Sequence, residues 1–176
     1  MIWVTSDTCF DNPSIMQYQN RPFCTVENMN CNLIDNWNSK VGHDDIVFHL
    51  GSFGLGTVKD QREKFIELNG KITLVRSKDD AYIKKLIEIG FDSIADKLEF
   101  EHGGYRFIMT HDPLSQEIFD DDSHGFINLH GSSIGSRKIV KNRVNVSSFL
   151  WEYSPVSLDE ILIEYKKKGA TRCCTV

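Results

Sequence analysis

Short apolar runs alternate with amphipathic stretches through the first half of the chain, and this alternation constrains the fold more than any other feature. The apolar runs at 2–6, 44–51 and 71–76 are rich in β-branched and aromatic residues, which favours buried strands. A stretch with helical spacing of its apolar residues follows each run. A repeated strand–helix order of this kind predicts a parallel sheet with helices packed on its faces.

Three stretches in this half are predicted helices, each with its apolar residues on one face. The residues predicted to point inward are Met29, Leu33, Ile34, Trp37 and Val41 in the first helix, Phe65, Ile66 and Leu68 in the second, and Tyr82, Ile83, Leu86 and Ile87 in the third. Gly70 and Gly90 follow the second and third stretches, and glycine commonly ends a helix. We therefore expect these helices to cover the parallel sheet.

The pattern changes after residue 95, where antiparallel strands are predicted. Two β-rich runs flank Gly103 and Gly104, a dipeptide suited to a tight hairpin turn. Further strands are expected at 125–131 and 143–151. A final helix begins after Ser157, which forms a capping box with Glu160, and its apolar face comprises Leu158, Ile161, Leu162 and Tyr165. We predict one domain over 1–176, with two packed sheets, helices outside and a frayed tail at 170–176.

Composition excludes several classes of protein. The formal net charge of -5 argues against nonspecific nucleic-acid binding, because such binding needs a dominant basic surface. The five cysteines have no regular spacing and no CxxC pair, so neither a disulfide framework nor a zinc knuckle is expected. No signal peptide and no membrane-spanning run is recognised, and we predict a cytoplasmic protein without membrane contact.

Five loops that follow predicted strands are the places where chemistry is expected, because functional residues gather at the carboxyl ends of parallel strands. These loops are 6–12, 50–56, 75–80, 109–113 and 129–135. The order of these loops and the sequences around them, including "IWVTSD", "GYRFIMTHDPL" and "NLHG", resemble the calcineurin-like metallophosphoesterases, specifically the small single-domain bacterial and phage type. The resemblance covers nearly the whole chain. It implies an α/β fold, a four-layer α-β-β-α sandwich of two mixed sheets.

The resemblance also implies a site for two divalent metals such as Mn or Zn, held by the motifs D-x-H, G-D, G-N-H-D, a lone His and G-H-x-H. This sequence departs from most of those positions. Asp7 matches the first aspartate and His111 matches the lone histidine. The remaining positions, which would carry the other ligands and the proton donor, are occupied by Cys9, Ser52, Lys78, Asp79, Ser132 and Ile134.

These replacements predict a vestigial site without a cofactor. A neutral serine does not bridge two dications, isoleucine is no ligand, and the ammonium of Lys78 would repel a metal. The residual metal candidates are Asp7, Cys9 and His111. The alternative readings are that Asp7 caps the first strand and that Cys9 is a small buried or loop cysteine. For Lys78 we weigh an ammonium in the vacated metal space, paired with Asp7, Asp79 or Asp80, against a solvated surface lysine.

We therefore predict a catalytically inactive relative, a pseudoenzyme, that acts by binding a protein partner, because fold does not dictate function. The phage resemblance extends this to a phage-encoded inhibitor of a host protein, acting in the host cytoplasm. Two alternatives stay open. The first is residual activity, as a single-metal phosphoesterase or a metal-free enzyme. The second is a nucleotide or phosphate-ligand sensor with Lys78 and Arg76 as anion contacts.

Overall fold

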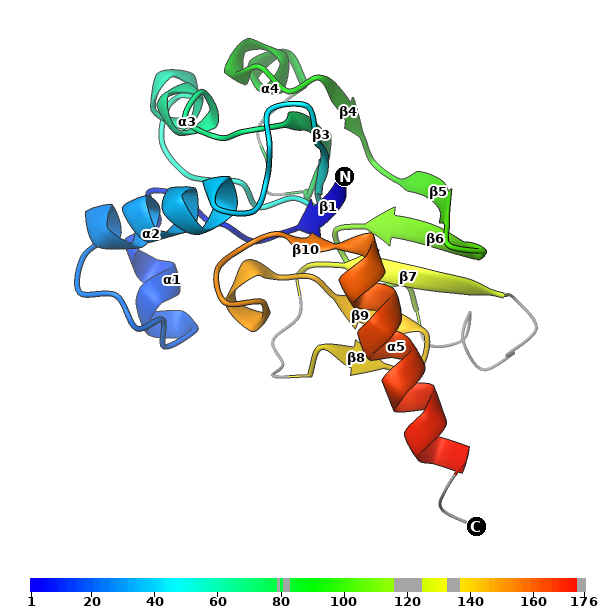
Figure 1. The fold of residues 1–176 in the computed structure, drawn as a ribbon. Helices are drawn as coiled ribbons and strands as arrows, with labels where there is room; N and C mark the ends of the chain where they lie inside the picture. Colours follow the sequence, from blue (N-terminus) through cyan, green and yellow to red (C-terminus); the bar gives the residue numbers. More distant parts are fainter. Residues whose placement is uncertain (79, 81–82, 116–124, 133–136, 174–176) are drawn as a thin grey trace.

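The computed structural model describes residues 1–78, 80, 83–115, 125–132 and 137–173, and they form two five-stranded sheets (Figure 1). The first sheet has the spatial order β10 (Val156–Ser157), β1 (Ile2–Thr5), β2 (Ile46–His49), β3 (Lys71–Val75) and β4 (Ser93–Ala95). The second has the order β5 (Leu98–His102), β6 (Tyr105–Thr110), β7 (Phe126–His130), β9 (Arg143–Asn145) and β8 (Ile139–Val140). Strands β1 to β4 are parallel and β10 is antiparallel; β6, β7 and β9 are parallel, with antiparallel β5 and β8 at the edges. Both sheets are therefore mixed, as the resemblance implies, whereas the antiparallel arrangement expected after residue 95 is wrong for β6, β7 and β9.

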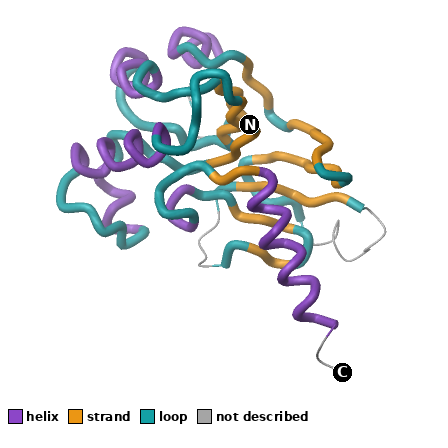
Figure 2. The backbone as a smooth tube through the Cα atoms, viewed as in Figure 1, coloured by secondary structure: helices purple, strands orange, loops and turns teal. Residues whose placement is uncertain are grey.

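The helices lie outside the sheets (Figure 2). They are α1 (Pro13–Tyr18), α2 (Val26–Asn38), α3 (Val58–Phe65), α4 (Ile83–Ile89) and α5 (Leu158–Cys173), with a 3₁₀ helix at Ser148–Leu150. Helices α1 to α4 gather on one side of the first sheet, whereas α5 contacts β10 and β1 and reaches the loop between β8 and β9 through a hydrogen bond from Tyr165 to Asn142 (Figure 1). Helix α5 continues through Cys173, into the segment predicted to be a frayed tail. No helix in these described segments is both long and apolar enough to cross a membrane.

Two hydrophobic cores lie on opposite faces of the first sheet, because successive strand residues point to opposite faces. Trp3 and Val47 pack with α2 to α4 in one core, whereas Val4 and Phe48 pack with the second sheet and α5 in the other. The predicted face of α2 is confirmed, since Met29, Leu33 and Trp37 are buried in the first of these cores and Ile34 packs against it. Val41, which follows the helix, is buried there too. The first sheet is thus covered on both sides, as parallel sheets usually are.

The predicted capping box and hairpin are both present. The Ser157 hydroxyl and N–H both bond the Glu160 carboxylate, and the Glu160 N–H donates back to Ser157 Oγ at 3.1 Å. Gly103 and Gly104 have φ angles of 57° and 79° between β5 and β6, a conformation that glycine adopts without strain. The hairpin of β5 and β6 therefore begins and ends where the sequence indicates.

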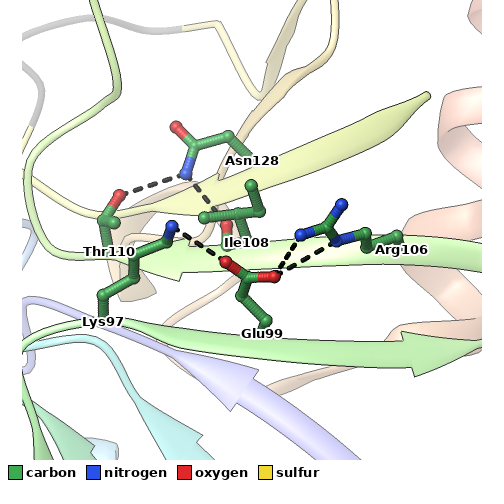
Figure 3. A network of polar contacts seen from close by, with 6 residues as sticks. All are labelled: Lys97, Glu99, Arg106, Ile108, Thr110 and Asn128. Carbon is green, nitrogen blue, oxygen red and sulfur yellow. Dashed lines mark hydrogen bonds and ion pairs between the residues drawn. The ribbon is translucent and has the colours of Figure 1, made fainter. Parts of the chain in front are cut away.

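Polar side chains connect the strands of the second sheet (Figure 3). Glu99 on β5 accepts hydrogen bonds from Arg106 on β6, and its other oxygen lies 2.9 Å from the Lys97 ammonium. The buried Asn128 amide on β7 donates to the Ile108 carbonyl at 2.9 Å and to Thr110 Oγ1 at 3.0 Å. The bonds of Asn128 hold the carboxyl end of β6 beside β7. His111, the lone histidine of the motif, follows β6 directly.

Some predicted details are wrong. Ile66 and Ile87 were expected to point inward but are 66% and 61% exposed, and Ile83 is exposed too. Helix α3 ends at Phe65, so Ile66 is only its cap. In the short α4, Leu86 is buried as predicted, but the second buried residue is Ile89. Other differences lie in the elements themselves: the strand expected at 143–151 covers only Arg143–Asn145, and α1, β4, β8 and β10 had not been predicted.

Candidate functional site

A cleft of about 400 Å³ opens where the loops after β1, β2, β3 and β7 meet, at the carboxyl ends of these parallel strands. Four of the predicted positions line it: Asp7, Cys9, Ser52 and Ser132. Asp80 and Ser147 line it as well. The structure thus brings together four of the residues that the resemblance had placed at one site.

Asp7 connects three loops through one carboxylate oxygen. Its Oδ2 accepts hydrogen bonds from Ser6 Oγ at 2.9 Å, Ser147 Oγ at 2.6 Å and the Ser132 N–H at 3.1 Å. The buried Arg21 guanidinium donates to the Asp7 carbonyl at 2.7 Å. Asp7 therefore does more than cap the first strand, because it joins the end of β1 to segments of the second sheet.

Gly131 and the neighbouring histidine explain why the loop after β7 can come so close to Asp7. A Cβ at Gly131 would lie 2.6 Å from Ser6 Oγ and 2.8 Å from Asp7 Oδ2, so only glycine fits there. His130 is buried, and its Nδ1 lies 2.8 Å from the Gly131 carbonyl, as expected for a structural histidine. Burial lowers the pKa of His130, which keeps the ring neutral.

His111 faces Ser52 across the cleft wall. Its Nδ1 lies 2.6 Å from the Leu50 carbonyl, which only accepts hydrogen bonds, so Nδ1 carries the proton. In the neutral tautomer that this bond selects, Nε2 is an acceptor, and it lies 3.4 Å from Ser52 Oγ. A Cβ at Gly51 would lie 2.7 Å from the imidazole Nδ1, so this glycine makes room for the ring.

Asp80 is a second internal acceptor, whereas the sequence analysis considered it only as a carboxylate that could pair with Lys78. Its Oδ2 accepts from the N–H groups of Ser77 at 2.6 Å and Ser52 at 3.2 Å, and its Oδ1 from that of Phe53 at 3.3 Å. The carboxylate thus ties the loop after β3 to the loop after β2. Ser6, Ser147 and Arg21 were also missed, since serines and an arginine distant in sequence carry no metal motif.

Cys9 is a buried thiol. Burial raises its pKa to about 12, although the nearby Arg21 guanidinium acts in the opposite direction. A thiol with so high a pKa is not a nucleophile at neutral pH, because that role needs the thiolate. The interpretation of Cys9 as a small buried cysteine is the one that the geometry favours.

Lys78 does not fill a metal position. Its side chain is 78% exposed, and its ammonium lies 3.9 Å from the carboxylate of Asp112, outside the cleft. The hypothesis that it pairs with a cleft carboxylate is wrong for Asp7 and Asp80, since both are already satisfied by hydrogen-bond donors of the fold. Asp79 and Ile134, two further predicted positions, lie outside the described residues.

The residues that the structure describes do not fit a two-metal centre. Catalytic metal sites use about three protein ligands for each ion, drawn from His, Cys, Asp and Glu. Within the described ranges, no group of at least three such side chains is placed to hold a metal ion. Asp7 Oδ2 is also engaged in hydrogen bonds, and the position of the bridging carboxylate holds Ser52.

No family model matches the chain. One curated protein is 34% identical over 176 residues, covering 96% of this chain and 92% of its own length: the uncharacterized protein MJ1445 of Methanocaldococcus jannaschii. The chain belongs to the MJ1445 family. Since that relative is uncharacterized, family membership supplies no activity for the site.

Two solved structures resemble the MJ1445-family chain in fold. A protein of unknown function, AQ665 from Aquifex aeolicus, has a TM-score of 0.72 with 22% identity, covering 92% of this chain and 97% of its own. A novel archaeal phosphodiesterase has a TM-score of 0.51 with 20% identity, covering 83% of this chain and 81% of its own. The predicted α/β fold, the α-β-β-α sandwich of calcineurin-like phosphoesterases, is confirmed. Identities this low concern the fold alone.

Proposed function

We propose that this chain is catalytically inactive as a phosphoesterase, a pseudoenzyme of that fold that acts by binding a protein partner at its cleft. The observation that carries the proposal is the state of Asp7, whose Oδ2 is used by two serine hydroxyls and one backbone N–H. A carboxylate that the fold has already satisfied gains little from a cation. The site is therefore built to hold its own loops together, with no need of a metal.

The residual phosphoesterase alternative has little support in the site. A single-metal version would use Asp7, Cys9 and His111. The Cys9 pKa of about 12 keeps the thiol protonated, and the His111 Nδ1 hydrogen faces the Leu50 carbonyl. Only the Nε2 atom of His111 and the second oxygen of Asp7 are left, and two groups do not hold a catalytic ion.

The rim of the cleft suits a protein partner. Tyr18 and Leu55 line it and are 65% and 50% exposed, while the floor is polar. Exposed aromatic and aliphatic side chains around a hollow are typical of interface centres, where a few anchors supply most of the binding energy. A cleft of about 400 Å³ is large enough for one or two side chains of a partner.

The charge of the cleft disfavours the phosphate-ligand alternative. Asp7 and Asp80 line the cleft, and no lysine or arginine belongs to its lining in the described segments. The two predicted anion contacts point elsewhere, because Lys78 is exposed beside Asp112, and Arg76 Nε lies 2.6 Å from the Asp96 carboxylate. A partner side chain that is neutral or basic fits this cleft better than a nucleotide does.

The relatives do not support the narrower prediction of a phage-encoded inhibitor of a host protein. Both named organisms, Methanocaldococcus jannaschii and Aquifex aeolicus, are cellular. The proposal is accordingly limited to partner binding, without a claim about the source of the chain or the partner's identity.

Affinity capture from a lysate of the source organism, with quantitative mass spectrometry, tests the proposal. The expected result is one stoichiometric protein whose capture is lost in Leu55→Asp and retained in Ile66→Asp. Both variants place a charge at an exposed aliphatic residue, but only Leu55 lines the cleft. Equal capture by both variants, or no stoichiometric protein, would contradict it. Hydrolysis of a phosphodiester with manganese that is lost in Asp7→Ala would contradict the claim of inactivity.

A further inference from the structure

We propose that Ser52 and His111 form a metal-independent nucleophilic pair, in which Ser52 Oγ is the site of covalent acylation by an uncharged ester bound in the cleft. This goes beyond the proposed partner binding, because it assigns a chemical reactivity to one atom. It rests on the geometry of the loop after β2, on the orientation of the imidazole, and on the charge of the cleft.

Ser52 occupies a sharp turn directly after a buried strand. Its φ of 56° lies in the left-handed region, which L-residues other than glycine rarely adopt. The turn is held by the Asp80 carboxylate, which accepts the Ser52 and Phe53 N–H groups. Ser52 also lines the cleft at the carboxyl edge of the sheet and is only partly buried. A strained strand-to-loop turn that presents a serine at this edge is a recurrent setting for a nucleophile.

His111 is oriented as a general base for this serine. The Leu50 carbonyl fixes the Nδ1 proton at 2.6 Å, and the free Nε2 faces Ser52 Oγ at 3.4 Å. Nucleophile, base and a third group that orients the base form the arrangement typical of activated serines. A separation of 3.4 Å is slightly long, as such contacts often are without substrate. Gly51 leaves space for the imidazole, because the Cβ of any larger residue would collide with it.

The reaction balances without a metal or a redox partner. Ser52 Oγ attacks the ester carbonyl while its proton moves to His111 Nε2. The bond between the acyl carbon and the alcohol oxygen then breaks, and the alcohol leaves with the proton from His111. A water molecule later attacks the acyl-serine, gives its proton to the same nitrogen, and releases the carboxylic acid as Ser52 regains its hydrogen.

The surroundings also set the rate and the choice of substrate. The N–H groups of Ser52 and Phe53, the nearest donors to a developing oxyanion, are bound to Asp80. One missing oxyanion donor typically lowers the rate by about 10²–10³-fold, so only esters with good leaving groups are expected to react quickly. Asp7 and Asp80 in the cleft lining disfavour anionic esters and favour uncharged ones.

Diisopropyl fluorophosphate, an uncharged probe, tests the pair on the purified full chain. Attack by Ser52 Oγ forms a serine–phosphorus bond and releases fluoride, and the serine proton goes to His111. The expected result is a single adduct by intact mass, located on Ser52 by peptide sequencing. The adduct is lost in Ser52→Ala. It forms more slowly in His111→Gln, by a factor of about 10² or more, and is unchanged in Ser93→Ala on β4.

An absent adduct, an adduct on another residue, or a His111→Gln rate within twofold of the original would overturn the pair. The position of the adduct in the unmodified chain decides the question even if a variant fails to fold. Circular dichroism of each variant checks that folding. The assay uses no partner, so its failure leaves the proposed partner binding untouched, and failure of partner capture leaves the labelling result unchanged.

Discussion

Replacement of Asp7 by alanine tests whether its carboxylate is a structural acceptor or an idle metal ligand. Three donors reach Oδ2, and a hydrogen bond to a charged group contributes about 1.5–3 kcal/mol net. The Ser147 hydroxyl also lies 2.7 Å from Asn145 Oδ1 and can turn to it, so the bonds are not all lost. Counting one to two lost bonds, we expect the free energy of unfolding to fall by roughly 2–4 kcal/mol.

Asp7→Asn is the matched control, since it keeps the shape of the side chain. Asp7 has a φ of 52°, and asparagine tolerates this left-handed conformation about as well as aspartate does, whereas alanine does not. The amide oxygen can still accept from the Ser132 N–H, but it carries no charge. The expected loss is therefore smaller, about 1–2 kcal/mol.

Urea and thermal unfolding in buffer with EDTA measure both variants. For a chain of this length, 1 kcal/mol shifts Tm by about 2–4 °C, so Asp7→Ala should lower Tm by roughly 4–16 °C. An idle metal ligand would behave differently, because removing it from a metal-free site relieves strain or changes nothing. A loss below about 0.5 kcal/mol would refute the structural role. So would stabilisation of the unmodified chain by manganese, which amounts to about 2.7 kcal/mol at 100 times the Kd.

Three further results are expected. Burial lowers the pKa of His49 from 6.5 to about 3, so on acidification the unfolded chain binds a proton on His49 before the folded chain does, and stability falls as the pH drops below about 6.5. Urea titrations at pH 7 and pH 5 should show that the free energy of unfolding falls less steeply with pH in His49→Gln, by up to about 1.4 kcal/mol per pH unit. Cys9 should react with iodoacetamide at pH 8 at least ~100-fold more slowly than the exposed thiols of Cys24 and Cys31. Peptide mass mapping measures the rates, and equal rates would contradict the burial of Cys9. Gly51→Ala places a Cβ 2.7 Å from a nitrogen of His111 and should lower the free energy of unfolding in urea by about 2–4 kcal/mol. Gly104→Ala, where a Cβ would have nothing within 4 Å, should lower it by about 1 kcal/mol, and equal losses would refute the clash.

The spacing of apolar residues correctly predicted the buried face of a helix where that face is long and regular. Helix α2 carries its apolar residues at regular spacing over three turns, so Met29, Leu33 and Trp37 are buried as expected. The pattern was less reliable in α3 and α4, because both are short, with eight and seven residues. Ile66 and Ile87 satisfy helical spacing but remain exposed. In such short helices the packing of neighbouring elements, which the sequence does not display, decides which apolar residues face inward.

The loops of the site were predictable, but their bonding was not. The order of strands and loops placed Asp7, Cys9, Ser52 and Ser132 together, and all four line the cleft. Their partners are serine hydroxyls and backbone N–H groups, which are common in every sequence and carry no recognisable spacing. The role of Ser147, 140 positions from Asp7, depends on the second sheet folding back over β1.

The cleft keeps its shape without metal ligands because the main chain holds it. The Asp7 N–H donates to the Gly51 carbonyl at 3.0 Å, and the Cys9 N–H to that of Ser52, also at 3.0 Å. Both donors, and Ser52 itself, have left-handed φ angles near 55°, a strained conformation that persists only where the surroundings impose it. These bonds join the loop after β1 to the loop after β2 whatever side chains the loops carry. Substitutions at the ligand positions can therefore remove the metal chemistry of the fold while leaving a preformed cleft, and its strained serine, available for another use.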